Sequence, residues 1–197
     1  PAGGSGGRRA GPGGGGKGTR RGAVRQANVT AGADTIKLPA GTLTLTRPGD
    51  DDGAILGDLD ITDSVTIVGA GSAKTTIDGN GSITHDRVFQ VLSTATNTTI
   101  RDLTITNGRK TANTFDEGGG LYWDGGGGRL TLTRVVVSGN RASYGGGLFL
   151  SYSPSGDAVT LNQVVVRSNP ATASAGGLAA PLDNPARFAL VHAPGYG

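Results

Sequence analysis

The chain has 197 residues, a length that suits one domain or a piece of a longer repeat protein. Glycine supplies 37 of them, but there is no three-residue glycine period, so a collagen helix is excluded. Cysteine and methionine are absent, which excludes a disulfide framework, a cysteine nucleophile and thiolate metal sites. No apolar run reaches the ~18 residues of a membrane-spanning helix. The chain opens on Pro1 without a secretory signal, so we interpret it as a fragment or a processed product.

The net charge of +3 is unevenly distributed along the chain. Residues 1–25 carry six bases and no acid, whereas the other 172 residues carry 12 bases and 15 acids. A strongly basic start therefore precedes a mildly acidic body. Fourteen of the 15 acids are Asp, which favours turns, and only Glu117 is Glu. This composition predicts an all-β protein that is rich in turns.

Short elements follow one another along the chain. Residues 1–22 are rich in glycine and arginine and predict a disordered basic arm. Residues 23–28 have helix propensity. Beyond them, alternation of apolar and polar residues between Gly, Asp and Asn predicts a series of strands. The first of these strands are expected at residues 34–38, 42–46, 64–68 and 75–78.

An internal repeat is the most informative feature of the sequence. Three similar segments begin at Thr99, Thr131 and Thr160, spaced by 32 and 29 residues. Each is preceded by a second apolar segment, and glycine runs precede the later copies. Aligning the segments predicts columns of equivalent core residues, namely Ile100 with Leu132 and Leu161, Leu103 with Val135 and Val164, and Ile105 with Val137 and Val166. Asn140 and Asn169 also align, which predicts that they stack at a turn and form a hydrogen-bonded ladder there.

A repeat of about 30 residues with two or three strands and no helical period is typical of a β-solenoid. A propeller blade needs about 40 residues and four strands, so a propeller is excluded. We predict a single-stranded parallel β-helix of about five coils over residues 23–180. Pro181, Pro185 and Pro194 predict that no strand follows Leu178 and that residues 181–197 form an irregular tail. The last coil would then be exposed and prone to association.

Several segments carry a family resemblance. Asp34 to Thr42, followed by residues 67–71 and 76–79, resembles the opening coils of bacterial right-handed parallel β-helix proteins. Ser138 to Asn140 and Gly145 to Leu148 are similar to repeats of polymorphic outer-membrane proteins. Residues 23–28 match the second half of a CSLREA-type segment, in which a short helix caps the solenoid. The cysteine, serine, leucine and glutamate of its first half are missing here.

This pectate-lyase-like superfamily includes surface proteins as well as enzymes. The resemblance implies an extracellular or outer-surface protein with a structural, adhesin-like display role. The alternative that it leaves open is a polysaccharide lyase or hydrolase. Asp58, Asp60 and Asp63 would combine with Arg87 or Arg101 in such a site, although their spacing does not require it. If Asp side chains converged with Arg or Lys on one face of the solenoid, the lyase or hydrolase would be favoured. From the sequence we assign no catalytic residue.

Candidate ligand-binding residues are aromatic or acidic. Exposed aromatic side chains could stack on sugar rings, and the candidates for carbohydrate contact are Tyr122, Trp123, Tyr144 and Tyr152. The alternative is that Tyr122 and Phe149 are stacked strand positions. Carboxylates at Asp50, Asp51 and Asp52 are candidate calcium ligands, with a solvated turn as the competing interpretation. No other cofactor is expected.

The expected partners are surface carbohydrate or a neighbouring protein. The basic arm suggests contact with nucleic acid, but it lacks aromatic residues for base stacking, so we expect no nucleic-acid partner.

Overall fold

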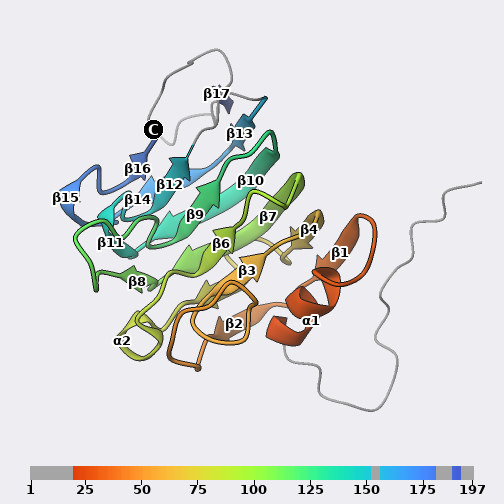
Figure 1. Cartoon of the computed structure of the whole chain (residues 1–197), viewed down its shortest axis with the longest axis horizontal. Coiled ribbons are helices and arrows are strands. Elements are labelled where there is room, and N and C mark those ends of the chain that lie inside the picture. Colours follow the sequence, from red (N-terminus) through yellow and green to blue (C-terminus); the bar gives the residue numbers. More distant parts are fainter. Residues whose placement is uncertain (1–19, 152–155, 181–187, 192–197) are drawn as a thin grey trace, which may run out of the picture.

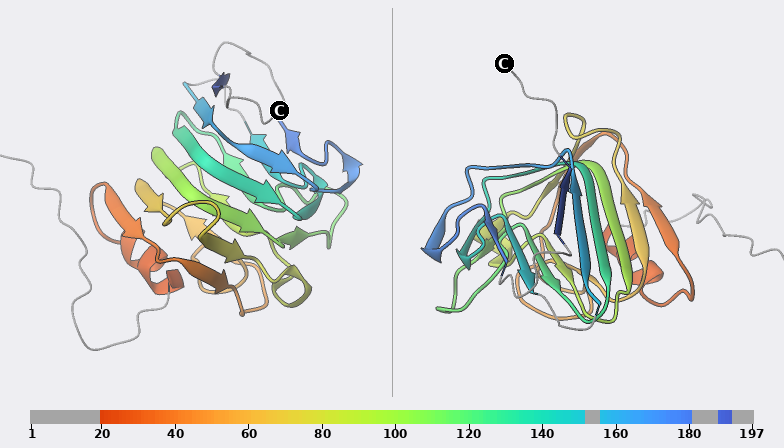
Figure 2. Two further views of the ribbon diagram at one scale, coloured as in Figure 1. Left: turned by 180° about the vertical axis from the view of Figure 1, so that it is seen from behind. Right: turned by 90° about the horizontal axis from the view of Figure 1, so that it is seen from above.

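The computed structural model describes residues 20–151 and 156–180, and the backbone of residues 188–191. In this part of the chain the strands lie in successive coils, shown in Figure 1 and from two further directions in Figure 2. Two short helices accompany them, α1 (Arg20–Ala27) and α2 (Gly81–Thr84). Neither is long enough to cross a membrane. The predicted basic arm lies almost entirely outside the described residues.

Three sheets make up the walls of the solenoid. The nine-stranded sheet contains β1 (Asp34–Lys37), β2 (Gly41–Thr44), β4 (Val65–Val68), β5 (Thr75–Asp78), β7 (Asn97–Thr106), β10 (Arg129–Ser138), β13 (Ala158–Asn162), β14 (Val165–Arg167) and β17 (Phe188–Val191). The five-stranded sheet contains β3 (Leu59–Ile61), β6 (Phe89–Val91), β9 (Leu121–Asp124), β12 (Leu148–Ser151) and β16 (Leu178–Ala179). The three-stranded sheet contains β8 (Arg109–Lys110), β11 (Arg141–Tyr144) and β15 (Ala171–Ser174).

All pairings between these strands are parallel. Each strand pairs with the equivalent strand of the neighbouring coil, which gives a β-solenoid of about five turns. The predicted all-β, parallel architecture is therefore confirmed. The helical content is slightly larger than expected, because α2 forms a single additional turn between β5 and β6.

The predicted core columns are present. Val137 of β10 pairs with Ile105 of β7 on one side and with Val166 of β14 on the other. Ile105 and Val137 are fully buried, whereas Val166 is only partly buried, on the last strand of its column. Because side chains alternate along a strand, every second residue points into the coil. Stacked coils therefore bury identical positions over one another.

An asparagine ladder fixes one corner of the solenoid. The side chain of Asn140 donates to Asn169 Oδ1 over 3.1 Å and accepts from the Gly108 amide over 2.9 Å. The side chain of Asn169 donates to the Val137 carbonyl over 2.9 Å. Both asparagines are buried. The predicted turn ladder is confirmed, and it satisfies backbone groups that the corner would otherwise leave without partners.

The helix α1 covers part of the open end of the first coil. It begins at Arg20, three residues before the predicted start, and ends at Ala27. Val24 and Ala27 are buried against the core, and the Arg21 guanidinium donates to the carbonyls of Leu56, Gly57 and Asp58. This anchor explains why the helix extends into residues expected to be disordered.

The prediction that no strand follows Leu178 is wrong. The strand β17 pairs in parallel with β13, with Phe188 beside Val159 and Leu190 beside Leu161. Pro185 and Pro194 lie outside its four residues, so they remove none of its backbone donors. The remaining tail, residues 181–187 and 192–197, lies outside the described residues.

Candidate functional site

The outer face of the five-stranded sheet gathers side chains from successive coils. In β9, Leu121 and Trp123 point into the core, so Tyr122 and Asp124 point outward. Register places Tyr122 beside Gln90 of β6 and Phe149 of β12. The outward column as a whole comprises Asp60, Gln90, Tyr122, Phe149 and Ala179. Most of these strands are visible side by side in Figure 1.

Two rings of this column form an aromatic ledge, made of Tyr122 and Phe149. Their centroids are 5.8 Å apart and their planes are inclined by 21°, so the rings are stacked. The Arg87 guanidinium, from the preceding coil, lies 5.0 Å from the Tyr122 ring centroid. A cation over a ring face is attracted by the ring quadrupole. The Tyr122 ring is therefore enclosed between Arg87 and Phe149.

One ring face of the ledge adjoins only a small side chain among the described strands. The residue that follows Phe149 is Ala179, whose side chain is a single methyl group. Phe149 is half-buried, and so is Ala179. Because rings on a strand stand roughly perpendicular to the sheet, the face of Phe149 above Ala179 has no bulky neighbour among the described residues of this column.

Polar groups surround the ledge. The Tyr122 hydroxyl is hydrogen-bonded to Ser151. Burial raises the pKa of Tyr122, and the nearby carboxylates of Asp124 and Glu117 raise it further. Burial also raises the pKa of Glu117, against the opposing effect of Arg87. The ledge thus combines an aromatic plane with two carboxyl groups and a hydroxyl.

An ionic cluster adjoins the ledge and is buried except at the exposed Asp50. It consists of Asp50, Asp58, Asp60, Asp86, Arg87 and Lys110. Lys110 Nζ lies 2.5 Å from Asp50 Oδ2 and 3.0 Å from Asp86 Oδ1. Asp86 is fully buried, and Lys110 is 7% exposed. The loop between β2 and β3 closes over the cluster, since a Cβ at Gly57 would collide with the Asp86 carboxylate.

Asp58 and Asp60 form a carboxyl pair within this cluster. Burial raises the pKa of Asp58 well above its usual range, and the charges of Asp86 and Asp60 add to this effect. Arg87 Nε is 4.0 Å from Asp58 Oδ2, too far for a hydrogen bond that would favour the ionised form. Burial and the neighbouring carboxylates therefore favour the protonated form of Asp58. Burial raises the pKa of Asp60 to about 6, against the hydrogen bonds from Ala54 N and Asp58.

The carboxyl pair predicts a pH dependence of stability. Because both folded-state pKa values lie above those of an unfolded chain, the stabilising contribution of the pair is complete below about pH 4. The contribution of Asp60 is lost as pH rises through about 6, and Asp58 adds a loss in the same direction. The side chains of Asp51, Asp52, Asp86, Arg21 and Arg87 face the pair, and burial also raises the pKa of Asp86. We expect the melting temperature to fall by roughly 3–6 °C between pH 5 and pH 7.5.

The substitution Asp60→Asn isolates this effect. The introduced amide can still accept from the Ala54 amide but cannot ionise, so we expect the variant to show a clearly smaller fall. Asp63→Asn, just beyond β3, is the matched control. Its melting temperature should fall between pH 5 and pH 7.5 as much as that of the parent protein. If the melting temperature of Asp60→Asn fell with rising pH as much as that of the parent protein, the carboxyl pair would not be the cause of the fall.

The three candidate calcium ligands face different partners. Asp50 pairs with Lys110, and Asp52 accepts from Gln90 Nε2 over 3.0 Å. Asp51 accepts from the amides of Gly53, Ile55 and Leu56. Within the described ranges, no group of three or more acidic or histidine side chains is arranged to hold a metal ion. Calcium binding stays a prediction.

The candidate aromatic residues occupy different environments. Tyr122 lies on the ledge, whereas Trp123 is 1% exposed inside the coil and out of reach of a surface ligand. Tyr144 is half-buried on β11, in the three-stranded sheet, and Tyr152 lies outside the described residues. The alternative that the sequence offers, with Tyr122 and Phe149 as stacked strand positions, is confirmed by the register and by the ring stacking. The sequence names Arg87 only for an enzymatic site, and it does not predict the position of Arg87 over the Tyr122 ring.

Comparison with known proteins gives no further identification. The chain matches no protein-family model, no curated protein and no solved structure. The β-solenoid fold is therefore established by the strand pairing itself, and the CSLREA-type and pectate-lyase-like resemblance rests on the sequence motifs.

Proposed function

We propose that this chain belongs to a secreted or outer-surface β-helix protein that displays a carbohydrate-binding ledge. The observation that carries the proposal is the stacked ring pair of Tyr122 and Phe149, whose Phe149 end adjoins only the small side chain of Ala179 among the described strands, with carboxyl groups nearby. The apolar face of a sugar ring suits an aromatic plane. The carboxylates of Glu117 and Asp124 can accept hydrogen bonds from sugar hydroxyls. The extracellular location is supported by the resemblance of the coils to surface β-helices.

A polysaccharide lyase or hydrolase is the second candidate. It is favoured by the convergence of Asp58, Asp86 and Lys110 with Arg87 on one face, and by carboxyl groups of raised pKa, which can act as general acids. However, Asp58 is 1% exposed and Asp60 is fully buried beneath the loop. A substrate cannot reach these carboxyls in this conformation. The cluster therefore fits a structural role, and binding at the ledge is favoured over cleavage.

A variant of the ledge tests the proposal. Removing the ring in Phe149→Ala deletes the stacking surface, so we expect affinity for a bound oligosaccharide to fall about five- to tenfold, as loss of one aromatic contact implies. The measurement is titration calorimetry on oligosaccharides selected from a glycan array. Val136→Ala, which removes an outward side chain from β10 on another sheet, is the matched control and should bind like the parent protein.

Two outcomes would contradict the proposal. Unchanged affinity in a folded Phe149→Ala protein would show that sugars do not stack on this ring. Release of unsaturated or reducing sugar products during the titration would favour the lyase or hydrolase instead.

A further inference from the structure

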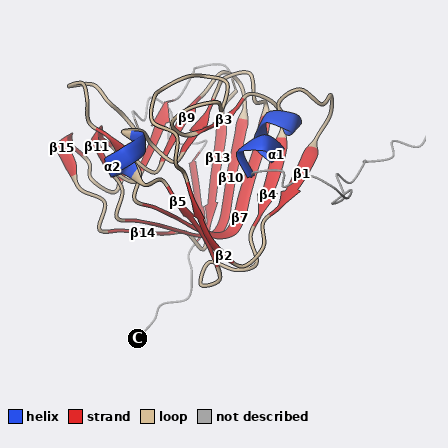
Figure 3. Ribbon diagram, turned by 90° about the horizontal axis from the view of Figure 1, so that it is seen from below, coloured by secondary structure: helices blue, strands red, loops and turns tan. Residues whose placement is uncertain are grey.

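The first coil has an uncovered strand edge. The helix α1 packs chiefly against β1 and β3. The strand β2 pairs only with β5, on one of its two sides, among the described strands. Figure 3 looks onto this end of the solenoid and shows α1 next to β1, whereas no described element lies along the outer edge of β2. An edge of this kind exposes backbone donors and acceptors to which another strand can bind.

Pairing with β5 determines which groups are exposed. The Gly41 amide donates to the Lys74 carbonyl over 2.7 Å, and the Leu45 amide donates to the Asp78 carbonyl over 2.9 Å. Successive residues of a strand direct their backbone groups to opposite sides. The amides and carbonyls of Thr42 and Thr44 therefore point away from β5, toward the open edge.

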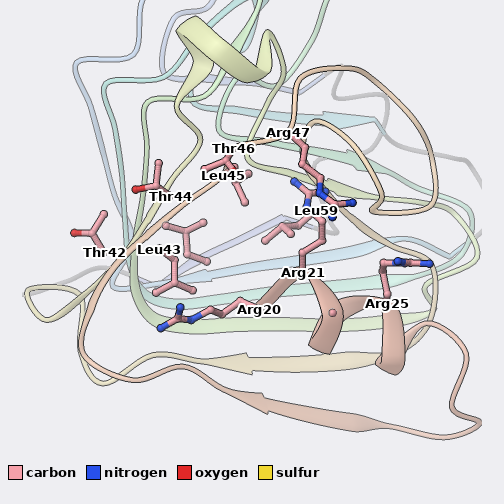
Figure 4. A pocket seen from close by; sticks show the side chains of 12 residues that line it. Arg20, Arg21, Arg25, Thr42, Leu43, Thr44, Leu45, Thr46, Arg47 and Leu59 are labelled. Carbon is pink, nitrogen blue, oxygen red and sulfur yellow. The ribbon is translucent and has the colours of Figure 1, made fainter. Parts of the chain in front are cut away.

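A cationic groove borders this edge. It has a volume of about 270 Å³ and lies between α1 and the β2 segment, with Leu43, Leu45, Leu59 and Ile77 among its lining residues. Figure 4 shows four arginines around it, Arg20, Arg21, Arg25 and Arg47. None of the described residues that line the groove is Asp or Glu.

Three of the four arginines are available to a ligand. The Arg21 guanidinium is occupied by the carbonyls of residues 56–58. No ion pair among the described residues includes Arg20, Arg25 or Arg47, and all three are exposed. Arg47 donates one long bond of 3.3 Å to the Ile55 carbonyl. The groove therefore carries positive charge that no described acidic residue of its lining neutralises.

We propose that the edge of β2 binds an extended acidic peptide segment as an added strand. The segment pairs with the backbone of Thr42 and Thr44, and its carboxylates reach Arg20, Arg25 and Arg47. Main-chain hydrogen bonds supply affinity in this mode of recognition, and side chains supply selectivity. A small oxyanion would satisfy the arginines but would leave the alternating donors and acceptors of the edge without partners. A peptide satisfies both sets of groups.

Fluorescence anisotropy with a labelled, alternating Glu-Val octapeptide tests this proposal. We expect saturable binding to the full chain and at least tenfold weaker binding of the corresponding Lys-Val peptide. Combining Arg20→Gln, Arg25→Gln and Arg47→Gln should weaken binding of the Glu-Val peptide at least tenfold. Three exposed arginines elsewhere, Arg109, Arg129 and Arg141, provide the matched triple Gln control, which should bind like the parent protein.

Methylated peptides distinguish strand addition from simple charge attraction without altering the protein. Only alternate residues of an added strand pair with the edge, so N-methylation of one alternate set should abolish binding and N-methylation of the other should be tolerated. Equal binding of both methylated peptides would overturn the proposal. It would also be overturned if inorganic phosphate or an acidic polysaccharide bound the arginines while the Glu-Val peptide did not. Failure of sugar binding at Phe149 would leave these outcomes unaffected.

Discussion

Replacing Val137 by Asp is expected to unfold the central coils. Val137 is fully buried between Ile105 and Val166, in the middle of the column that runs through β7, β10 and β14. Burial of a valine contributes about 1.5–3 kcal/mol, and an unpaired buried carboxylate adds a further cost of several kcal/mol. The free energy of unfolding should therefore fall by about 5 kcal/mol or more, which exceeds most single substitutions.

The neighbouring residue provides a control for this prediction. Val136 is on the same strand but points outward and is half-buried, so Val136→Asp can keep its charge in water. We expect Val136→Asp to lower the free energy of unfolding by less than about 1 kcal/mol, in addition to the effect of the lower strand propensity of Asp. Urea denaturation of both variants is the measurement. If Val137→Asp were no less stable than Val136→Asp, the inward and outward assignment of β10 would be incorrect.

Replacing Lys110 by Met is expected to have the second-largest effect. Burial alone would lower the pKa of Lys110, but hydrogen bonds with Asp50 and Asp86 outweigh it and raise the pKa. Lys110→Met removes the cation that faces the fully buried Asp86. Breaking a buried ion pair by removing one partner costs about 3–5 kcal/mol, because a buried charge is left uncompensated.

A double variant separates charge loss from loss of packing. When Lys110→Met is combined with Asp86→Asn, the uncompensated carboxylate is absent. The introduced amide can still accept from the Arg87 amide, as Asp86 does over 2.9 Å. Calorimetric melting should show the double variant to be more stable than Lys110→Met alone. Lys74→Met, at an exposed lysine, is the control and should be near neutral. If the losses of stability caused by Lys110→Met and Asp86→Asn simply added in the double variant, Lys110 would not be the counter-ion of Asp86.

Much of the fold could be predicted from the repeat. Aligned segments identify core columns, because a solenoid stacks equivalent residues, and the pairs Leu132–Leu161 and Asn140–Asn169 follow directly from that alignment. The start of α1 could not be predicted this way, since Arg21 bonds to carbonyls 35–37 residues away. The strand β17 is not predicted from the sequence, because the prolines around it indicate an interruption, although they lie beyond its ends.

The candidate site was less accessible to sequence reasoning. The contact between Lys110 and Asp50 joins strand β8 to the loop between β2 and β3, 60 positions away in the sequence, and no local pattern indicates it. The burial of Trp123, by contrast, could have been predicted from its alternation with Tyr122. The position of Phe149 beside Tyr122 does follow from the repeat, which offers the two residues as stacked strand positions. The small neighbour of this ring, Ala179, also follows from the repeat, because Gly176-Gly177-Leu178 aligns with the glycine run and Leu148 of the preceding unit.

Binding of sugar to the face of Phe149 above Ala179 can be measured most directly by nuclear magnetic resonance. The chain would be labelled on its phenylalanine and tryptophan rings and titrated with oligosaccharides that it binds. We expect the Phe149 ring signals to shift while those of the buried Trp123 remain largely unchanged, and sugar ring protons to move upfield through stacking. Binding with no shift at Phe149, or with the largest shifts at ring signals remote from the ledge, would contradict the account.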